Sequence, residues 1–256
     1  MNLETFAGRL TDRLRHDDFA EIDPSANGLQ VAPDGATVEH AAFAVDAVAE
    51  TMDAAVAAGA DLLVTHHGIS WAGGIERLTG PTYDRVATLV ENDVALYVSH
   101  LPLDAHPELG NAAGVADVLS LTDRAGFAAV GPEDIGLRGS LPDPLTGPGL
   151  RSHLEPALDT GGEPIRLLDF GPDAIRDVAV VTGAGAEYVE AAAAVGADAL
   201  VTGEGKGRTY HDAKEHDLTV LLAGHYATET FGVRSLQTLA EDWGLETTYL
   251  DRPTGL

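Results

Sequence analysis

Apolar residues recur along this chain in runs of strand length, separated by segments with helical spacing. The first segment, residues 3–16, places its apolar side chains on one face and predicts a short amphipathic helix. Strands are predicted at 27–33, 40–46, 60–67, 94–99, 177–183, 197–203, 218–224 and 246–250. Helices are predicted around 50–58, at 83–92, 187–196 and 230–243, and a helix or loop at 207–217. This alternation predicts an α/β fold with parallel strands and right-handed crossovers.

Two segments with this pattern are nearly the same sequence. AAVAAGADLLVTHH (54–67) lies over the stretch within EAAAAVGADALVTGE (190–204) when it is moved by 137 residues, from Ala54 to Ala191. A second match, with a different offset, places residues 94–104 over 219–229. It pairs His100 with His225 and Asp104 with Glu229. We therefore predict an internal duplication that produces two similar α/β lobes, with a metal site in the cleft between them.

The lobes are expected at residues 1–125 and 126–256. Residues 122–172 are rich in glycine and proline, as in GSLPDPLTGPG, and predict a connecting region with one or two short strands and a helix near 148–159.

The charge of the chain is strongly negative. It has 41 acidic and 15 basic residues, a net charge of −26, and the acidic residues are scattered rather than gathered in a tail. Such a surface is tolerated when concentrated cations screen it, so we interpret it as adaptation to a salt-rich, halophilic cytoplasm. The alternative is an acidic face that binds a basic ligand. Nucleic-acid binding is disfavoured, because no basic patch is present to contact phosphates.

Cysteine and targeting signals are both absent from the sequence. Without cysteine, any metal site must use imidazole and carboxylate ligands. The N-terminus does not resemble a signal peptide, and no apolar stretch has the length of a membrane span. We therefore expect a soluble cytoplasmic protein without membrane contact.

His66 and His67 follow a buried strand, at the edge of the sheet where ligands gather in open α/β folds. Taken alone, the pair is equally consistent with one core and one surface histidine. Asp104, His225 and Glu229 favour the metal interpretation, because imidazoles and carboxylates are ligands of zinc, manganese and iron. This number of ligands is sufficient for two divalent ions.

Other features carry weaker signals. GAGAE (183–187) could hold a phosphate at a helix start, but it lacks the third glycine of a dinucleotide fingerprint, and a tight turn is the simpler interpretation. Trp71 is either a stacking platform for a base or a lid on the core. Glu204 and His211 are candidates for proton transfer or for contacts to metal ligands, with surface polar residues as the alternative.

Five ordered blocks extend over nearly the whole chain. They are NGLQV, VTHHGISW, SHLPLDAHPELGNAAGVADVL, VTGEGKGRTYHDAKEHDL and AGHYATETFGVRSL. With these blocks the chain resembles the NIF-three-like family, whose members are often labelled GTP cyclohydrolase I type 2 homologues, in its short form. The family commonly has proline after the histidine pair, whereas Gly68 stands here and is expected to loosen that turn.

The resemblance implies two α/β lobes with a dinuclear metal centre and assembly into a toroidal hexamer. It implies that the metal ligands are His66, His67, Asp104, His225 and Glu229, with Glu229 bridging the ions. It also implies that His100 lies near the site without being a direct ligand.

We therefore expect a metal-dependent hydrolase of a nucleotide or another small phosphorylated or heterocyclic compound. Two divalent ions would activate a water molecule, and His100, Glu204 or His211 would transfer the proton. The alternative is a non-catalytic role in metal storage, metal delivery or metal-dependent regulation.

Overall fold

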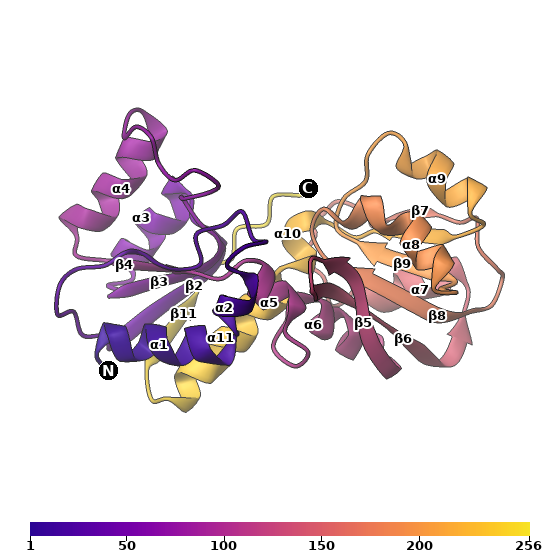
Figure 1. Cartoon of the computed structure of the whole chain (residues 1–256), viewed down its shortest axis with the longest axis horizontal. Coiled ribbons are helices and arrows are strands. Elements are labelled where there is room, and N and C mark those ends of the chain that lie inside the picture. The colour runs from indigo at the N-terminus through magenta and orange to yellow at the C-terminus, as the bar shows by residue number, and fades with distance from the viewer. The chain divides into compact units, whose positions relative to one another are not determined.

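A computed structural model describes residues 1–256, and the chain forms two compact units (Figure 1). The first unit contains Met1–Leu103 and Gly232–Arg252, and the second contains Asp104–Phe231 and Pro253–Leu256. The first passage between units therefore falls at Leu103 rather than at the expected residue 125. A C-terminal segment also returns to the first unit, because its strand pairs with the sheet there.

The first unit is built on a five-stranded sheet with the order β1-β4-β3-β2-β11. The strands β11, β2, β3 and β4 are parallel to one another, and β1 is antiparallel to β4. The elements are α1 (Leu3–Arg13), α2 (His16–Phe19), β1 (Gly28–Val31), β2 (His40–Asp46), α3 (Ala49–Ala57), β3 (Leu62–His67), α4 (Pro81–Glu91), β4 (Ala95–Val98), α11 (Thr230–Asp242) and β11 (Glu246–Tyr249).

Helices cover both faces of this sheet (Figure 1). Side chains alternate along each strand, so residues such as Ala42 and Leu63 face α3 and α4, whose Met52 and Leu89 are fully buried with them. On the other face α1 packs through Phe6, whose ring contacts the rings of Tyr97 and Trp243 edge-on. Two-sided burial explains why these strands read as continuous apolar runs.

The second unit is built on a six-stranded sheet with the order β5-β6-β8-β9-β10-β7. Its elements are α6 (Asn111–Val118), β5 (Thr122–Val130), β6 (Glu133–Leu145), α7 (Gly147–Leu154), β7 (Arg166–Leu168), β8 (Ile175–Val181), the 3-10 helix η1 (Gly185–Tyr188), α8 (Val189–Ala194), β9 (Ala199–Thr202), α9 (Thr209–Glu215), β10 (Thr219–Leu222) and α10 (His225–Thr228). The short helix α5 (Leu101–Ala105) contains the passage from the first unit to the second.

Two helical layers also enclose the second sheet. Leu150 of α7 and Val115 of α6 are buried with Val180 and its neighbours on one face. Val189 of α8 and Ala213 of α9 are buried with the side chains of the other face. The parallel pairs β8/β9 and β9/β10 form the part of this sheet that matches the first unit.

The duplicated segments have the same β-α-β topology and the same strand register. Ala41 lies opposite Leu62 in the first unit, and Val178 lies opposite Ala199 in the second. Both pairs are related by the 137-residue offset of the sequence repeat. The predicted duplication of 41–65 in 178–202 is therefore confirmed.

A turn at the surface of each unit shows how closely the copies agree. The Asp61 carboxylate accepts hydrogen bonds from the amides of Glu39 and His40, at 2.8 and 3.0 Å. The Asp198 carboxylate accepts bonds of the same lengths from the amides of Arg176 and Asp177. The repeated aspartate therefore has the same function in each copy, satisfying two amides where the preceding strand begins.

The third strand of each copy follows a different offset from the one that the sequence match indicates. Ala95 pairs with Leu62 and Thr219 pairs with Ala199, so the ladders relate these strands by 124 residues instead of 125. By this register His225 corresponds to Leu101, the first residue of α5, rather than to His100. His100 and His225 are therefore paired in the sequence alignment but do not occupy equivalent positions in the two sheets.

The expected connecting region contains more structure than its glycines and prolines indicate. It forms the antiparallel pair β5/β6 and the edge strand β7, half of the second sheet. Pro142 and Pro144 fall within β6 where the ladder to β8 shifts register, between Ser140 and Leu145. Prolines are tolerated at such an irregularity because the hydrogen bonds they would remove are already absent. The helix expected near 148–159 is α7.

The helices are all too short or too polar to cross a lipid bilayer.

Candidate metal centre

Three histidines of the first unit bring their rings together. His66 and His67 end β3, and His100 follows β4, the neighbouring parallel strand. The ring centroids are 4.6 Å apart for His66 and His67, 5.1 Å for His66 and His100, and 5.6 Å for His67 and His100. One ring nitrogen from each of the three lies within 4.8 Å of the others, close enough to surround an ion.

The second nitrogen of each imidazole is held by an oxygen atom. His66 Nδ1 donates to the Ser99 carbonyl at 3.0 Å, because a carbonyl can only accept. His67 Nδ1 lies 2.8 Å from an Asp46 carboxylate oxygen, and His100 Nδ1 lies 2.8 Å from Asp23. These bonds place the proton on Nδ1 and the lone pair on Nε2, the arrangement that metal-binding histidines adopt in proteins.

Asp23 is the most enclosed of these acceptors. Its side chain is 1% exposed, and its two oxygens accept four bonds of 2.8 Å, from His100 Nδ1, the amides of Ser25 and Leu101, and the Asn27 amide group. Burial would raise the pKa of Asp23, but the hydrogen bonds from His100, Asn27 and the Ser25 amide hold it below its ordinary value. The carboxylate therefore stays ionised and orients His100.

The second unit brings together the remaining candidate ligands in two groups. His225 opens α10, and its Nε2 lies 3.1 Å from Glu229 at the end of the same turn. Glu204, which is half exposed, lies 3.7 Å from His225 Nδ1. Asp104 accepts hydrogen bonds from Asn111 at 2.8 Å and from Thr182 at 3.2 Å, and these bonds orient its carboxylate.

Glycines allow the backbone to approach His225 and Glu229 closely. Gly183 has a φ of 59°, and a Cβ there would collide with the Glu229 carboxylate. A Cβ on Gly203 would meet the backbone of Gly183 and of His225. The amides of Gly183 and Gly185 bond to Thr228 and Thr202 hydroxyls, so GAGAE is a tight turn whose donors are used internally. A phosphate loop at this position is not formed.

Residues 1–254 match the sequence profile of the family described as Duf34/NIF3 (NGG1p interacting factor 3). The chain belongs to the Duf34/NIF3 family. Over 256 residues it is 56% identical to a GTP cyclohydrolase 1 type 2 homolog from Halobacterium salinarum, with all of both chains covered. It is 40% identical over 232 residues to the homolog of the same name from Escherichia coli K12, covering 90% of this chain and 91% of that one.

Solved structures agree with the family assignment. The structure of a protein named ybgI, described as of unknown function, has a TM-score of 0.89 at 37% identity and full coverage of both chains. A protein from Thermus thermophilus has a TM-score of 0.88 at 36% identity, again with full coverage. The predicted family and the α/β fold class are confirmed.

Gly68, where the Duf34/NIF3 resemblance leads one to expect proline, does not leave the turn loose. The Gln30 side chain packs against Gly68, and a Cβ at this position would collide with its amide group. Gln30 Oε1 accepts the amides of Ile69 and Ser70 at 2.8 and 3.1 Å. The expectation of a loosened turn is therefore wrong, because a side-chain amide from β1 holds the backbone instead of a proline ring.

The candidate proton-transfer residues lie in different surroundings. His100 is part of the three-imidazole group, and Glu204 lies beside His225. His211 is exposed on α9, where its ring lies 5.5 Å from that of Tyr210, and it belongs to none of the converging ligand groups.

Sequence reasoning did not identify the residues that orient the histidines. Asp46 ends the apolar run of β2 and lies directly opposite His67 in the ladder between β2 and β3. Asp23 and Asn27 lie in a loop more than 70 residues before His100. A polar residue at the end of an apolar strand was the available signal for Asp46. Asn27 and Gln30 stand in the NGLQV block, which predicts a strand and carries part of the family resemblance but gives no sign of these hydrogen bonds.

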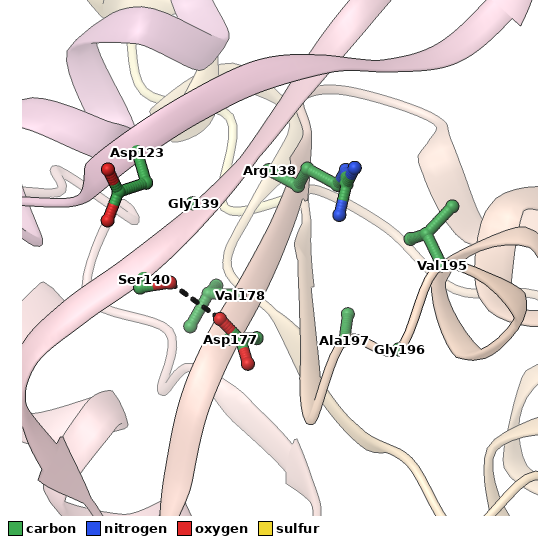
Figure 2. Close-up of a pocket in the computed structure, with 9 residues that line it drawn as sticks. All are labelled: Asp123, Arg138, Gly139, Ser140, Asp177, Val178, Val195, Gly196 and Ala197. Carbon is green, nitrogen blue, oxygen red and sulfur yellow. Dashed lines mark hydrogen bonds between the residues drawn. The ribbon is translucent and has the colours of Figure 1, made fainter.

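One pocket in the second unit lies away from His225 and the glycines beside it (Figure 2). It has a volume of about 150 Å³ and is lined by Asp123, Arg138, Gly139, Ser140, Asp177, Val178, Val195, Gly196 and Ala197. Among these residues, the Ser140 hydroxyl donates to the Asp177 carboxylate at 2.6 Å (Figure 2). The pocket is at the start of β8 and β9, whereas Gly183, Gly203 and His225 follow the ends of these parallel strands.

Proposed function

We propose that the chain binds two divalent metal ions and uses them to hydrolyse a nucleotide or another small phosphorylated or heterocyclic compound. The observation that carries this proposal is the set of three imidazoles whose Nδ1 atoms are all held by oxygen acceptors. The donor set fits zinc, manganese or iron, which accept imidazole nitrogen and carboxylate oxygen. The name GTP cyclohydrolase 1 type 2 homolog, which relatives carry, is consistent with a hydrolase but supplies no substrate for this chain.

The proposed ligands come from both units. His66 and His67 would be supplied by the first unit, and Asp104, His225 and Glu229 by the second, with Glu229 shared by both ions. The course of the chain supports this combination. It leaves the first unit between Leu103 and Asp104 and returns between Phe231 and Gly232, so candidate ligands flank both passages. His100 and Asp104 are separated by four residues, a span of at most about 14 Å even when extended.

Residues of this chain would determine which ring nitrogen of each histidine carries a proton. Bound ions would polarise the substrate and lower the pKa of water. Asp46 and the Ser99 carbonyl keep the ligand nitrogens of His67 and His66 unprotonated. Asp23 holds the proton of His100 on Nδ1, so that Nε2 is the basic atom available to accept a proton from the reacting water. Glu204, next to His225, is the second candidate for this step.

Metal analysis of natively purified protein tests the proposal, followed by a hydrolysis screen of nucleotides, phosphoesters and cyclic amides with the metal found. We expect two ions per chain and turnover of at least one substrate class, which chelation abolishes and the same metal restores. Two ions without turnover in any class would instead support metal storage, delivery or regulation. Protein that neither retains nor takes up divalent metal would refute both functions.

Assembly into a ring of six copies is also part of the proposal, and it rests on the family resemblance alone. Light scattering of the purified protein in molar KCl measures the oligomer directly. A monomer under these conditions would exclude the ring.

A further inference from the structure

Trp71 is held firmly beside the three-imidazole group. The amide of Ala26 donates to the Ser70 carbonyl at 3.1 Å, and Ser25 and Trp71 form an isolated antiparallel bridge. The amide of Gly74 then closes a turn on the Trp71 carbonyl at 2.7 Å. Gln30 fixes the two residues before Trp71. The backbone that carries the indole is therefore positioned from both sides.

The indole packs on imidazoles rather than on the aliphatic core. Its ring centroid lies 5.2 Å from that of His100, edge-on at 80°, and 6.1 Å from that of His67, tilted at 40°. Trp71 nevertheless remains 39% exposed, and it belongs to none of the buried apolar clusters. A lid on the core would bury the ring, so this interpretation of Trp71 does not fit.

The groups that contact Trp71 fit a flat ring. Its indole meets the imidazoles of His67 and His100, and its backbone pairs with Ser25; no lysine or arginine is among these three residues. Ser25, opposite Trp71 in the bridge, is 7% exposed, and its hydroxyl has no hydrogen-bond partner in the chain. A hydroxyl can donate to or accept from a ring nitrogen or an exocyclic group at the edge of a heterocycle.

We propose that Trp71 is the stacking platform for a planar heterocyclic ring, and that the Ser25 hydroxyl contacts the polar edge of this ring. This inference rests on the proposed function, since it names the part of the substrate that the same site would bind. A stacked ring would lie against the imidazoles of His67 and His100, next to the reacting groups. Stacking on an indole tolerates different bases, because each presents a π face.

Intrinsic fluorescence tests the proposal, because the chain has two tryptophans, Trp71 and Trp243. In Trp243→Phe the indole of residue 71 is the single reporter. The probes are GMP, AMP, pterin and, as a matched compound without a heterocycle, ribose 5-phosphate. Titrations use the full chain with metal bound and after chelation. We expect saturable quenching by at least one heterocyclic probe and none by ribose 5-phosphate.

Isothermal titration calorimetry measures the affinity of variants that keep Trp243. It distinguishes loss of a stacking contact from a general loss of packing at Trp71. Trp71→Ala should weaken binding of the quenching probe about tenfold or more, whereas Trp71→Phe, which keeps an aromatic face, should retain most of the affinity. Ser25→Ala should weaken binding of the heterocycle and leave ribose 5-phosphate unaffected. Metal content and thermal unfolding of the three variants should match the unmodified protein.

Three results would overturn the stacking proposal: no quenching by any heterocyclic probe up to millimolar concentration, equal binding of GMP and ribose 5-phosphate, or unchanged affinity in Trp71→Ala. These outcomes are distinct from failure of the proposed function. Calorimetric binding of a heterocyclic probe that Trp71→Ala weakens, in a protein that binds no metal, would support the ring site and refute the hydrolase. Metal-dependent turnover with unchanged kcat and KM in Trp71→Ala would support the hydrolase and refute the stacking site.

Discussion

Replacing Asp23 by asparagine should destabilise the protein far more than the same change at Asp46, although each carboxylate holds one histidine. Each Asp23 oxygen accepts two hydrogen bonds, in a side chain that is 1% exposed. Asparagine keeps one oxygen and directs an NH₂ group at two donors. At least two bonds to a charged group are then lost without water to replace them, a cost of about 3 to 5 kcal/mol.

Asp46 provides the matched control. Its side chain is 30% exposed, and its carboxylate accepts one bond, from His67. Because water can reach the site, Asp46→Asn should cost about 1 kcal/mol or less. Its effect should appear in metal binding instead, as a loss of about 10- to 100-fold in affinity, since the variant no longer fixes the tautomer of a proposed ligand. Asp23→Asn should retain two metals, because His100 is proposed not to be a ligand.

Urea unfolding in molar KCl, followed by circular dichroism, measures both stabilities, and metal analysis measures both occupancies. The folded-state pKa of Asp23 is lowered, so its contribution is complete above the unfolded pKa of about 4 and is lost as the pH falls through the folded value. The difference between the unmodified protein and Asp23→Asn should therefore shrink in acid. Equal unfolding free energies for the two variants would refute the reasoning, and loss of metal from Asp23→Asn would make His100 a ligand.

Three further predictions concern the ligands, a buried histidine and the surface charge. Glu229→Ala should lose both metals whereas His100→Ala keeps about two, and retention of two metals by the Glu229 variant would contradict the bridging assignment. Burial lowers the pKa of His16 to about 4, so the unfolded chain binds the proton first and stability should rise with pH between about 4 and 6.5. His16→Gln should flatten this dependence in urea titrations, and an unchanged slope would exclude His16 as its source. With a net charge of −26, the proposed oligomer should dissociate and the melting temperature should fall between ~1 M and ~0.1 M salt, where the Debye length grows from about 3 to 10 Å. Identical light scattering and melting at both salts would favour an acidic binding face over halophilic adaptation.

Much of the secondary structure is determined locally and could be read from the sequence. The run HAAFAVD is β2 with the predicted limits, and the strand before His66 and His67 forms as expected. Burial on both sheet faces produces continuous apolar runs, and glycine follows α3 and α8 at Gly59 and Gly196, with φ of 71° and 79°. The repeat even specified the register between the first two strands of each copy, because one turn chemistry is present in both.

The partners across the sheet were decided by tertiary structure. β11 joins β2 in the first unit although it is last in the chain, with Glu246 opposite His40. β5 and β6 pair through a sequence with exposed and irregular positions, which has little apolar periodicity to detect.

The same limit applies to the candidate site. His66, His67 and the carboxylates could be chosen by residue type and position at strand ends, but the contacts that orient them could not. Asp23 reaches His100 over 77 residues of sequence, and Asp46 meets His67 because two parallel strands lie in one register. Local periodicity reports which face of an element is buried, whereas a hydrogen bond between distant side chains depends on how whole elements pack. The candidate ligands could therefore be recognised in the sequence by residue type. Which nitrogen of each histidine carries the proton is determined only in the folded chain.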